Sequence, residues 1–340
     1  MPPLDQMRRE LTHQARILLR RLGSGFTPSP RATTRFRDRY FAEQPVHLRR
    51  MKEYRLERFP DSGPLPWLDR PDAEAEIARE RAQGELSEEE ASRCAQWARD
   101  GFVLLPGLFT AEYLDSVWAA YERGIADGTV VLQPEQAIRG DPLPPRSLDP
   151  HLKVPELDAL LRHPKLLKWS NRLLGRESVP FQTLLSHKGS QQKPHSDSIH
   201  MTTYPPGYLT ACWVAFEDIH PDCGPVEYYP GSHRLPFLSS DALGISTADF
   251  RRRGYATYFE RYEPAIANLI ARESLVPVPF RARKGDVLFW HANLIHAGSP
   301  RRNLSLSRKA AVCHYFAKGA VCYHDLAGTL ADPGRVGAAH

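Results

Sequence analysis

The sequence predicts an α+β protein in which helices come first and a β-sandwich or barrel follows. Helical patterns occupy the chain up to about residue 174, and beyond Val179 the sequence changes to short apolar runs separated by Gly and Pro turns. Helices followed by a run of strands are typical of α+β folds whose strands form a sandwich or barrel. With 340 residues, 41% of them hydrophobic, the chain is long enough for one elaborated domain or for two.

The first 60 residues are distinctly basic. They hold 14 Lys and Arg against 6 Asp and Glu, a surplus of +8, so the other 280 residues carry 31 against 34, or −3. Apolar residues recur at helical spacing from Leu4 to Leu22 with arginines on the other faces, which predicts a basic amphipathic helix. We expect it to pack on its own domain or on a sister subunit, and peripheral membrane contact is the alternative. Residues 1–85 are interpreted as an extension and linker, with a Pro-rich stretch at Gly63–Asp72.

Composition excludes several classes of protein. No run of about 18 uncharged apolar residues occurs, and no apolar segment follows the basic N-terminal residues, so we expect neither a spanning helix nor a secretory signal. The cytoplasm is then the default location. Five scattered cysteines without a Cys-x-x-Cys pair argue against a disulfide framework or a zinc knuckle and indicate reduced, mostly buried thiols.

The helical part of the chain carries recognisable start and stop signals. Ser87 followed by Glu90 is a capping-box pattern that begins a helix over 87–99, and Gly101 ends it. The segments that follow are a strand at Phe102–Leu105, a helix capped by Thr110, a Pro-rich loop at 141–150 and a helix at roughly 155–174.

Six β-type runs follow this helical part. They read FQTLLSHKG, YLTACWVAFED, PVEYYPG, LVPVPFRA, DVLFWHANLIHAG and KAAVCHYFA. An insert at about 238–272 interrupts them, and its residues Tyr255, Tyr258, Tyr262 and Ile266 recur at helical spacing. We expect this insert to cap one mouth of the barrel and to act as a lid.

The segment KPHSDSIHM places His195 and Asp197 on either side of one residue. Residues i and i+2 of an extended chain project to one face, so the two side chains can converge on one metal ion, although such a pair alone also arises by chance. GDVLFWHANLIHAGSP supplies His291 and His296 as candidates for a third ligand. Two histidines and one carboxylate are the ligand set of non-haem Fe(II) oxygenases, and they leave open positions for an oxidising co-substrate and dioxygen.

A 2-oxo acid co-substrate would need a cation for its distal carboxylate. Arg308 lies a few residues beyond His296, at the start of a predicted strand. A guanidinium binds a carboxylate through two parallel hydrogen bonds, so Arg is the expected residue type. Arg301 and Arg302 in the same spacer are competitors, and a solvated strand-end cation is the alternative for Arg308.

Four blocks of the chain, in this order, resemble the phytanoyl-CoA dioxygenase family of Fe(II)/2-oxoglutarate-dependent oxygenases. They are GFVLLPGLFTAEYL, HSDSIH, CWVAFEDIHPDCGPVEYYPGSH and GDVLFWHANLIHAGSPRRNLSLSR. The resemblance covers about residues 86–318 and implies a double-stranded β-helix (jelly-roll, cupin-like) core with flanking helices and an N-terminal helical extension. The catalytic domain would span 86–325, with the lid insert at 238–272 and a tail at 326–340.

The resemblance also implies roles for individual residues. His195, Asp197 and His296 would bind Fe(II), and Arg308 would bind the distal carboxylate of 2-oxoglutarate. The same co-substrate would be contacted by three further residues: Trp213 lining its pocket, Ser305 placing a hydroxyl near the distal carboxylate, and, as a weaker candidate, Gln182. His291 is expected to pack or to support the site. The histidines without an independent claim are His187, His200, His220, His233 and His314.

The expected activity is hydroxylation of an unactivated C–H bond of a small-molecule metabolite, with Fe(II), 2-oxoglutarate and dioxygen giving succinate and CO2. Asp197 argues against halogenation, because related iron halogenases carry a small residue in its place. Desaturation, epimerisation or cyclisation at the same site, and a catalytically silent ligand-binding member, remain alternatives.

Arg251, Arg252 and Arg253 in the insert suit either an anionic substrate or a solvated cluster. Nucleic-acid binding is not expected, but the basic N-terminus keeps a nucleic-acid oxygenase as a third alternative. The oligomeric state is not predicted.

Overall fold

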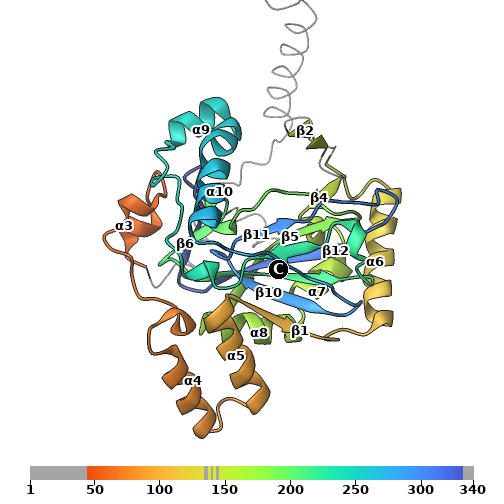
Figure 1. Ribbon diagram of the computed structural model, residues 1–340, viewed down its shortest axis with the longest axis horizontal. Helices are drawn as coiled ribbons and strands as arrows, with labels where there is room; N and C mark the ends of the chain where they lie inside the picture. Colours follow the sequence, from red (N-terminus) through yellow and green to blue (C-terminus); the bar gives the residue numbers. More distant parts are fainter. Residues whose placement is uncertain (1–43, 134–136, 139–140, 143–144, 332–340) are drawn as a thin grey trace, which may run out of the picture.

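The computed structural model describes residues 44–133, 137–138, 141–142 and 145–331 (Figure 1). The basic helix expected between Leu4 and Leu22 and the last residues of the predicted tail lie outside this part of the chain. Helices precede and flank a set of antiparallel sheets, so the predicted α+β class is confirmed. All five cysteines are buried and free, as expected.

A six-stranded sheet with the order β1-β10-β7-β12-β5-β4 forms the centre of the protein. Every neighbouring pair in it is antiparallel. Its strands are β1 (Phe102–Leu105), β4 (Arg146–Leu148), β5 (Ser178–Ser186), β7 (Leu209–Ala215), β10 (Val287–His291) and β12 (Ala310–Ala317). Because successive side chains of a strand point to opposite faces, the sheet has an outer face under the helices and an inner face toward the smaller sheets.

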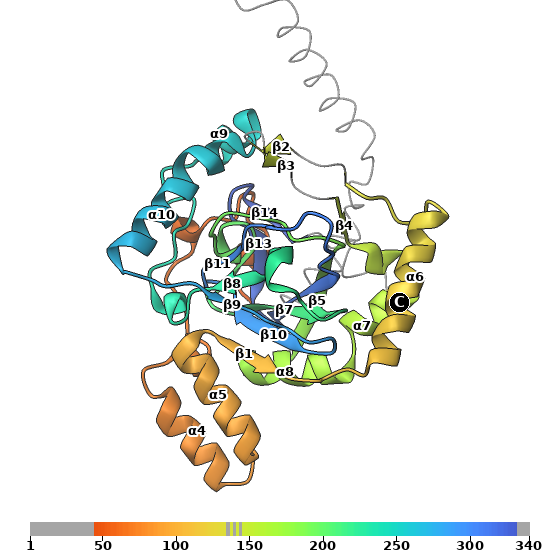
Figure 2. The ribbon, with the colours of Figure 1, turned by 45° about the vertical axis from the view of Figure 1, so that its right-hand side comes forward.

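The outer side of the sheet carries five helices, of which the last three lie against the sheet, while the first two pack on each other and project away from it (Figure 2). They are α4 (Ala73–Ala82), α5 (Glu88–Asp100), α6 (Ala111–Ala126), α7 (Pro155–Leu161) and α8 (Pro164–Leu174). The predicted capping box of α5 is present, since the Ser87 side chain accepts from the backbone N–H of Glu90 and the Glu90 side chain accepts from that of Ser87. Gly101 ends the helix in the left-handed conformation, with φ at +80°.

Three smaller sheets complete the β part. Their orders are β11-β8-β9, β14-β13-β6 and β2-β3. The strands are β2 (Ala137–Ile138), β3 (Asp141–Pro142), β6 (Thr202–Tyr204), β8 (Val226–Tyr228), β9 (Val278–Pro279), β11 (His296–Gly298), β13 (Val321–His324) and β14 (Thr329–Leu330). An apolar cluster joins Trp213 and Leu288 on the inner face of the central sheet to Tyr228 and Phe280, so the sheet of β11, β8 and β9 packs on that face.

The insert at 238–272 is helical, as its spacing predicts. It contains α9 (Thr247–Arg253), a π-helical turn η7 (Tyr258–Tyr262) and α10 (Glu263–Arg272). Tyr258, Tyr262 and Ile266 are buried in an apolar cluster that also contains residues next to the predicted metal ligands. Figures 1 and 2 place α9 and α10 on the side of the sheets away from α6. We call residues 238–272 the lid.

The described part of the N-terminal extension packs on the sheet of β14, β13 and β6. Phe59 stacks on Tyr204 of β6 with ring centroids 4.1 Å apart, and Tyr54 and Leu48 enter the same apolar cluster. The short elements of the chain are α3 (Val46–Arg49), η1 (Leu56–Arg58), η2 (Trp67–Asp69), η3 (Pro150–Leu152), η4 (Asp197–Ile199), η5 (Pro221–Cys223) and η6 (Ser232–Arg234).

Several expected segments differ in detail. The helix expected at 155–174 is divided into α7 and α8, because Pro164 cannot continue α7 and begins a new helix. The expected loop at 141–150 contains β4. The run DVLFWHANLIHAG is divided into β10 and β11, and residues 326–331, expected to begin a tail, include β14 and the buried Leu326. Within the described residues, no helix has the length and apolar character needed to cross a membrane.

Candidate metal centre

Two separate segments bring the three predicted metal ligands together. His195 precedes the single turn η4, and His296 begins β11. Their backbones form an isolated antiparallel bridge, in which each N–H donates to the carbonyl of the other residue at 3.0 and 2.8 Å. His195, Asp197 and His296 each offer one ligand atom, and these atoms all lie within 4.8 Å of one another. The structure therefore brings together the triad that the sequence proposes.

Backbone carbonyls orient both imidazoles of the triad. His195 Nδ1 lies 2.9 Å from the carbonyl oxygen of Lys193, and His296 Nδ1 lies 3.0 Å from that of Leu294. A carbonyl oxygen can only accept, so each Nδ1 carries the hydrogen and leaves the Nε2 lone pair for a metal. Burial lowers the pKa of His195 to about 4, which keeps the ring neutral as a metal ligand must be.

Asp197 is an ionised carboxylate with its two oxygens in different surroundings. Oδ2 accepts a hydrogen bond of 2.7 Å from Trp290 Nε1 and lies 3.8 Å from His314 Nε2, while Oδ1 lies 3.6 Å from His296 Nε2. Burial alone would raise the pKa of Asp197, but the imidazoles of His296 and His314 hold it well below its usual range. Oδ1 is thus the oxygen turned toward the other two ligands. The donor set of two imidazole nitrogens and one carboxylate oxygen fits Fe(II).

Trp290 and His314 both contact Asp197, and sequence reasoning missed both contacts. Both lie on the inner face, and strand register places them in one row with Ala211 of β7. The alternation in VLFWH and AAVCHYFA assigns each of them to a face, but the sequence does not reveal that this face carries Asp197. His291, one residue after Trp290, points the other way, where its Nε2 lies 3.2 Å from Asp69 Oδ2, and it does not join the triad.

Arg308 is a buried cation without a carboxylate partner among the described residues. Its Nη1 donates to the carbonyl of Gly224 at 2.9 Å, while Nε has no hydrogen-bond partner. Burial lowers its pKa to about 10, so it stays charged at neutral pH. A buried guanidinium with an unsatisfied N–H is stabilised by a further acceptor, and most strongly by an anion. This geometry fits the carboxylate-binding role expected for Arg308.

Of the two competing arginines, Arg302 lies at the surface, whereas Arg301 lies near Arg308: its charge contributes to the lowered pKa of Arg308, and its own buried Nε has no hydrogen-bond partner among the described residues. Arg302 is exposed and lies 3.9 Å from Asp222 Oδ1, and the Arg301 guanidinium donates to the carbonyl of Leu304. Trp213 is buried on the inner face with its ring 6.0 Å from the Arg308 guanidinium carbon. Gln182 is half-buried on β5, in register opposite His314. Ser305 is exposed and its hydroxyl donates to Asn303 Oδ1, so it stays outside the buried group around Arg308.

A second arginine, Arg146 on β4, faces the same interior. Its strand neighbour Ser147 points to the outer face, where its hydroxyl bonds the Tyr121 hydroxyl at 2.8 Å, so the alternation of the strand turns Arg146 inward. Its positive charge contributes to the lowered pKa of His195, after burial and His296, and it opposes the burial that raises the pKa of Tyr255. Among the described residues, no hydrogen bond or ion pair engages its guanidinium. Sequence reasoning missed Arg146, because the prolines around it predicted a loop.

The lid forms an aromatic wall beside the triad. The His200 ring lies between the ligand and the lid, with centroid distances of 6.0 Å to His195, 5.2 Å to Tyr258 and 5.8 Å to Tyr255. Burial lowers the pKa of His200 well below its usual value, so this ring is neutral and packs as an aromatic. Tyr255 is 45% exposed and marks the outer end of the wall. His200 therefore lies between His195 and the part of the lid around Tyr255 and Tyr258, a position the sequence did not indicate.

Comparison with known proteins gives consistent matches. The family described as phytanoyl-CoA dioxygenase (PhyH) matches residues 97–310, more than half of the chain. The ectoine dioxygenase of Bordetella bronchiseptica is 27% identical over 231 residues, which are 63% of this chain and 73% of that protein.

Two solved structures show the fold. The epimerase SnoN in complex with Fe3+, alpha ketoglutarate and nogalamycin RO has a TM-score of 0.53 at 22% identity, over 68% of this chain and 85% of that one. EctD from S. alaskensis with 2-oxoglutarate and 5-hydroxyectoine has a TM-score of 0.51 at 20% identity, over 71% and 79%. At these levels of sequence identity, the two similarities show the fold alone.

Proposed function

The chain belongs to the phytanoyl-CoA dioxygenase family, and we propose on that basis that it is an Fe(II)- and 2-oxoglutarate-dependent oxygenase of a small molecule. The observation that carries the proposal is the cluster of His195, Asp197 and His296, with two Nε2 lone pairs and one carboxylate oxygen turned together. The unpartnered Arg308 supports it, because a dicarboxylate co-substrate needs a cation at its far end.

The residues of this chain would bind and orient the metal and the co-substrate and would enclose the reacting centre. When bound, Fe(II) would supply dioxygen activation coupled to oxidative decarboxylation of 2-oxoglutarate. His195, Asp197 and His296 would hold the metal on one side and leave the other side to 2-oxoglutarate and dioxygen. Trp290 keeps Asp197 Oδ2 occupied so that Oδ1 stays available, Arg308 would hold the distal carboxylate, and the lid would keep water from the reacting centre.

We further infer that the β part is a double-stranded β-helix. Support comes from the central antiparallel sheet, from the sheet of β11, β8 and β9 packed on its inner face, and from ligands placed between them. The assignment of 86–325 as the catalytic unit and the cytoplasmic location also stay predictions. The described residues 44–85 and 326–331 contact the same core.

The proposed outcome is hydroxylation, and product mass tests it. The purified chain with Fe(II), 2-oxoglutarate and candidate small molecules should form succinate together with a product that has gained one oxygen atom. Loss of two hydrogens would indicate desaturation or ring formation, and an unchanged mass with altered stereochemistry would indicate epimerisation. Absence of succinate under every condition would favour the silent ligand-binding alternative and overturn the proposal.

Arg308 can be tested separately. Arg308→Gln should weaken 2-oxoglutarate binding by about 30-fold or more, since truncating one partner of a buried charge pair costs roughly 2–5 kcal/mol. Arg302→Gln is the matched control, because this exposed arginine should leave binding unchanged. Equal affinity of Arg308→Gln and the unmodified chain in calorimetry would remove Arg308 from the site and direct the test to Arg301.

We also propose that Arg146 binds a carboxylate in the same interior. The lid arginines first considered for an anionic substrate are engaged, since Arg252 pairs with Asp249 and Arg253 with Glu260. Arg146 has no such partner among the described residues and faces the triad. The carboxylate belongs either to the metal-side end of 2-oxoglutarate or to the substrate.

Arg146→Gln distinguishes these sources. Loss of 2-oxoglutarate affinity assigns Arg146 to the co-substrate, whereas unchanged 2-oxoglutarate affinity with weaker turnover of carboxylate-bearing substrates assigns it to the substrate. No change in either quantity would overturn the assignment. The exposed Arg281→Gln is the control.

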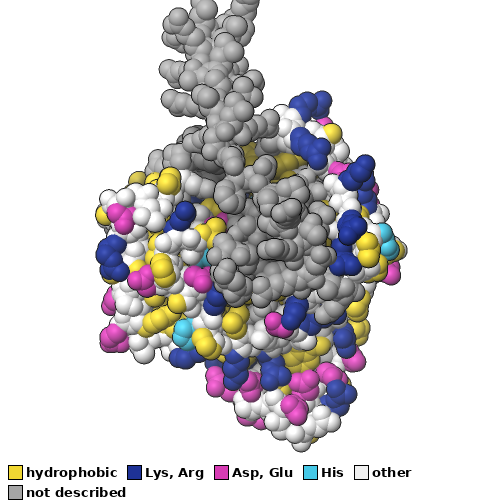
Figure 3. Space-filling view, turned by 180° about the vertical axis from the view of Figure 1, so that it is seen from behind, with side chains coloured by type: hydrophobic (Ala, Val, Ile, Leu, Met, Phe, Trp, Pro, Cys, Tyr) yellow, Lys and Arg dark blue, Asp and Glu magenta, His cyan; other side chains and the backbone are white. Residues whose placement is uncertain are grey.

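The charge distribution on the face drawn in Figure 3 favours a small-molecule substrate over nucleic acid. Figure 3 shows one face on which Lys and Arg side chains are interspersed with Asp and Glu. Nucleic-acid binding depends on clustered positive charge and falls steeply with salt. Salt-dependent binding of the full chain to DNA or RNA would reopen that alternative.

A further inference from the structure

The residue between the first two metal ligands is held by the lid. The backbone N–H of Ser196 donates to the hydroxyl oxygen of Tyr262 at 2.9 Å, and the Ser196 hydroxyl lies 3.0 Å from the same oxygen. Tyr262 is fully buried, and Ser196 is only 2% exposed. A buried N–H in this position has no water to replace its acceptor, so the lid satisfies a polar group of the turn that presents His195 and Asp197.

The contact continues as a chain of buried hydroxyls. Ser196 Oγ lies 2.7 Å from Ser198 Oγ, and Ser198 donates to Asn293 Oδ1 at 3.3 Å. Asn293 Nδ2 donates to the carbonyls of His233 and Leu235 at 3.0 and 2.8 Å. Two carbonyl acceptors fix the Asn293 amide with its oxygen toward Ser198. The hydrogen bonds must then run in one direction, from Tyr262 through Ser196 and Ser198 to Asn293.

This chain connects both segments that supply metal ligands. Ser196 lies between His195 and Asp197, and Asn293 lies in the turn that leads from β10 to His296. Tyr262 is the last residue of the π-helical turn of the lid, a feature that recurs at functional sites. Its ring stacks on Tyr258 with centroids 5.0 Å apart, so the same lid segment reaches from the exposed Tyr255 to the metal turn.

We propose that Tyr262 is a positioning residue through which the lid fixes the geometry of the metal turn. Its hydroxyl accepts a hydrogen bond from the backbone N–H of Ser196 and donates one to Ser196 Oγ. The second bond begins the chain that ends at Asn293, in the turn before His296. The lid is then part of the support of the metal site as well as its cover. The inference rests on the proposed function for the identity of the metal, but its test needs no substrate.

Tyr262→Phe removes the hydroxyl and keeps the ring. The Ser196 N–H then loses its acceptor, and the turn can rotate away from the ligand geometry. Substitution of a residue that supports a metal ligand typically lowers metal affinity 10- to 100-fold. We therefore expect Tyr262→Phe to bind Co(II), used as the probe, about tenfold more weakly. The visible absorption bands of bound Co(II) should also shift, which a purely structural effect on stability would not produce.

Two further variants keep the test decisive. Tyr229→Phe deletes a hydroxyl from the same apolar cluster without touching the chain of hydroxyls, and it should bind Co(II) like the unmodified protein. Ser198→Ala interrupts the chain at its middle and should give a smaller loss of affinity than Tyr262→Phe. If Tyr262→Phe fails to fold, Ser198→Ala carries the test.

The outcomes separate the two proposals. Unmodified affinity and unmodified spectra in both Tyr262→Phe and Ser198→Ala would overturn the positioning role and leave the proposed function intact. An unmodified protein that bound neither Co(II) nor Fe(II) would overturn the proposed function, and the positioning role with it.

Discussion

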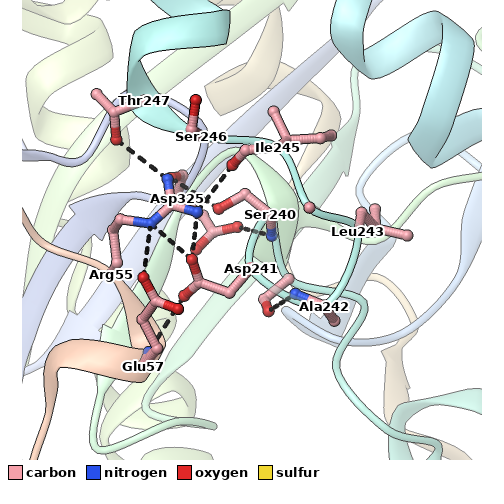
Figure 4. Close-up of polar contacts among 12 residues, drawn as sticks. Arg55, Glu57, Ser240, Asp241, Ala242, Leu243, Ile245, Ser246, Thr247 and Asp325 are labelled. Atoms are coloured by element: carbon pink, nitrogen blue, oxygen red, sulfur yellow. Dashed lines mark hydrogen bonds and ion pairs between the residues drawn. The ribbon is translucent and has the colours of Figure 1, made fainter.

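The lid is anchored at two places by different chemistry, and we call these the Tyr262 end and the Arg55 end. At the end near the metal turn, Tyr262 reaches Ser196 through uncharged hydroxyl and backbone groups. At the other end, Figure 4 shows the lid held by a buried cation of the N-terminal extension: Arg55 donates from Nε to Asp241 Oδ1 at 2.6 Å, and from Nη2 to the carbonyl of Ile245 at 2.8 Å. Arg55 and Asp241 are both largely buried.

The Tyr262 contact acts on the geometry of the metal turn, whereas the Arg55 contact attaches the lid to the rest of the protein. Hydroxyl chains are short-ranged and directional, so the Tyr262 end specifies geometry at the metal. The Arg55 end joins three distant parts of the chain, since the neighbouring Ser240 N–H donates to Asp325 at the end of β13. Removing one partner from such a buried ion pair leaves an uncompensated charge, so this end controls whether the lid is attached.

The largest effect should come from the metal ligands themselves. His195→Ala removes one of three donors, and we expect loss of detectable Fe(II) binding and of succinate formation. Folding should survive, because the Arg55 end is untouched. The exposed His220→Ala serves as the control. Equilibrium dialysis measures Fe(II) binding by the two variants. Full retention of binding in His195→Ala would show that the triad is misassigned.

Arg55→Met should remove the buried ion pair with Asp241 at the Arg55 end of the lid. Leaving Asp241 buried and unpaired is expected to lower the free energy of unfolding by about 3–5 kcal/mol. Arg58→Met, which removes an exposed arginine paired with Glu53, should cost less than about 1 kcal/mol. Urea unfolding compares the two variants. Replacing Arg55 and Asp241 together with apolar residues should restore part of the loss, and equal losses in the single and double variants would contradict this account.

Asp325 gives the Arg55 end a pH dependence. Burial raises its pKa to about 6, against about 3.8 for an unperturbed carboxyl. The folded state therefore binds more protons than the unfolded state between these values, so this group's stabilising contribution is present below about pH 4 and is lost as pH rises through about 6. The difference corresponds to roughly 2–3 kcal/mol.

Asp325→Asn isolates that contribution. It keeps an acceptor for Ser240 and cannot ionise, so thermal unfolding between pH 4 and 7 should become flatter than in the unmodified protein. A pH profile identical to that of the unmodified protein would mean that Asp325 is ionised in both states.

Trp290→Phe should have the smallest of these effects. It removes the donor to Asp197 Oδ2 and keeps an aromatic ring on the inner face. We expect about tenfold weaker metal binding with little change in stability. Trp169→Phe, in the outer apolar cluster, is the control. A loss of affinity equal in both variants would assign the effect to packing.

The features that the sequence predicted correctly depend on residues close together in the chain. The capping box at Ser87 and the pairing of His195 with Asp197 depend on residues a few positions apart, so pattern alone identifies them. His296 follows from the order of motifs. Each of these features survives unchanged in the folded chain.

Long-range pairing accounts for what the sequence left out. His314 reaches Asp197 only because β12 pairs with β7 in one particular register. Arg146 faces the interior only because β4 joins the edge of β5, and Tyr262 contacts Ser196 across a sequence separation of 66 residues. None of these relations has a signature in the residues that carry it.

The backbone bridge between His195 and His296 has a kinetic consequence. Each amide hydrogen is held by the carbonyl of the other residue, so neither can exchange with solvent until the two segments separate. Separation also pulls apart the imidazoles that would bind the metal. Hydrogen exchange at these two amides and escape of a bound metal ion should therefore report one opening event, and a bound ion should slow exchange at both positions together.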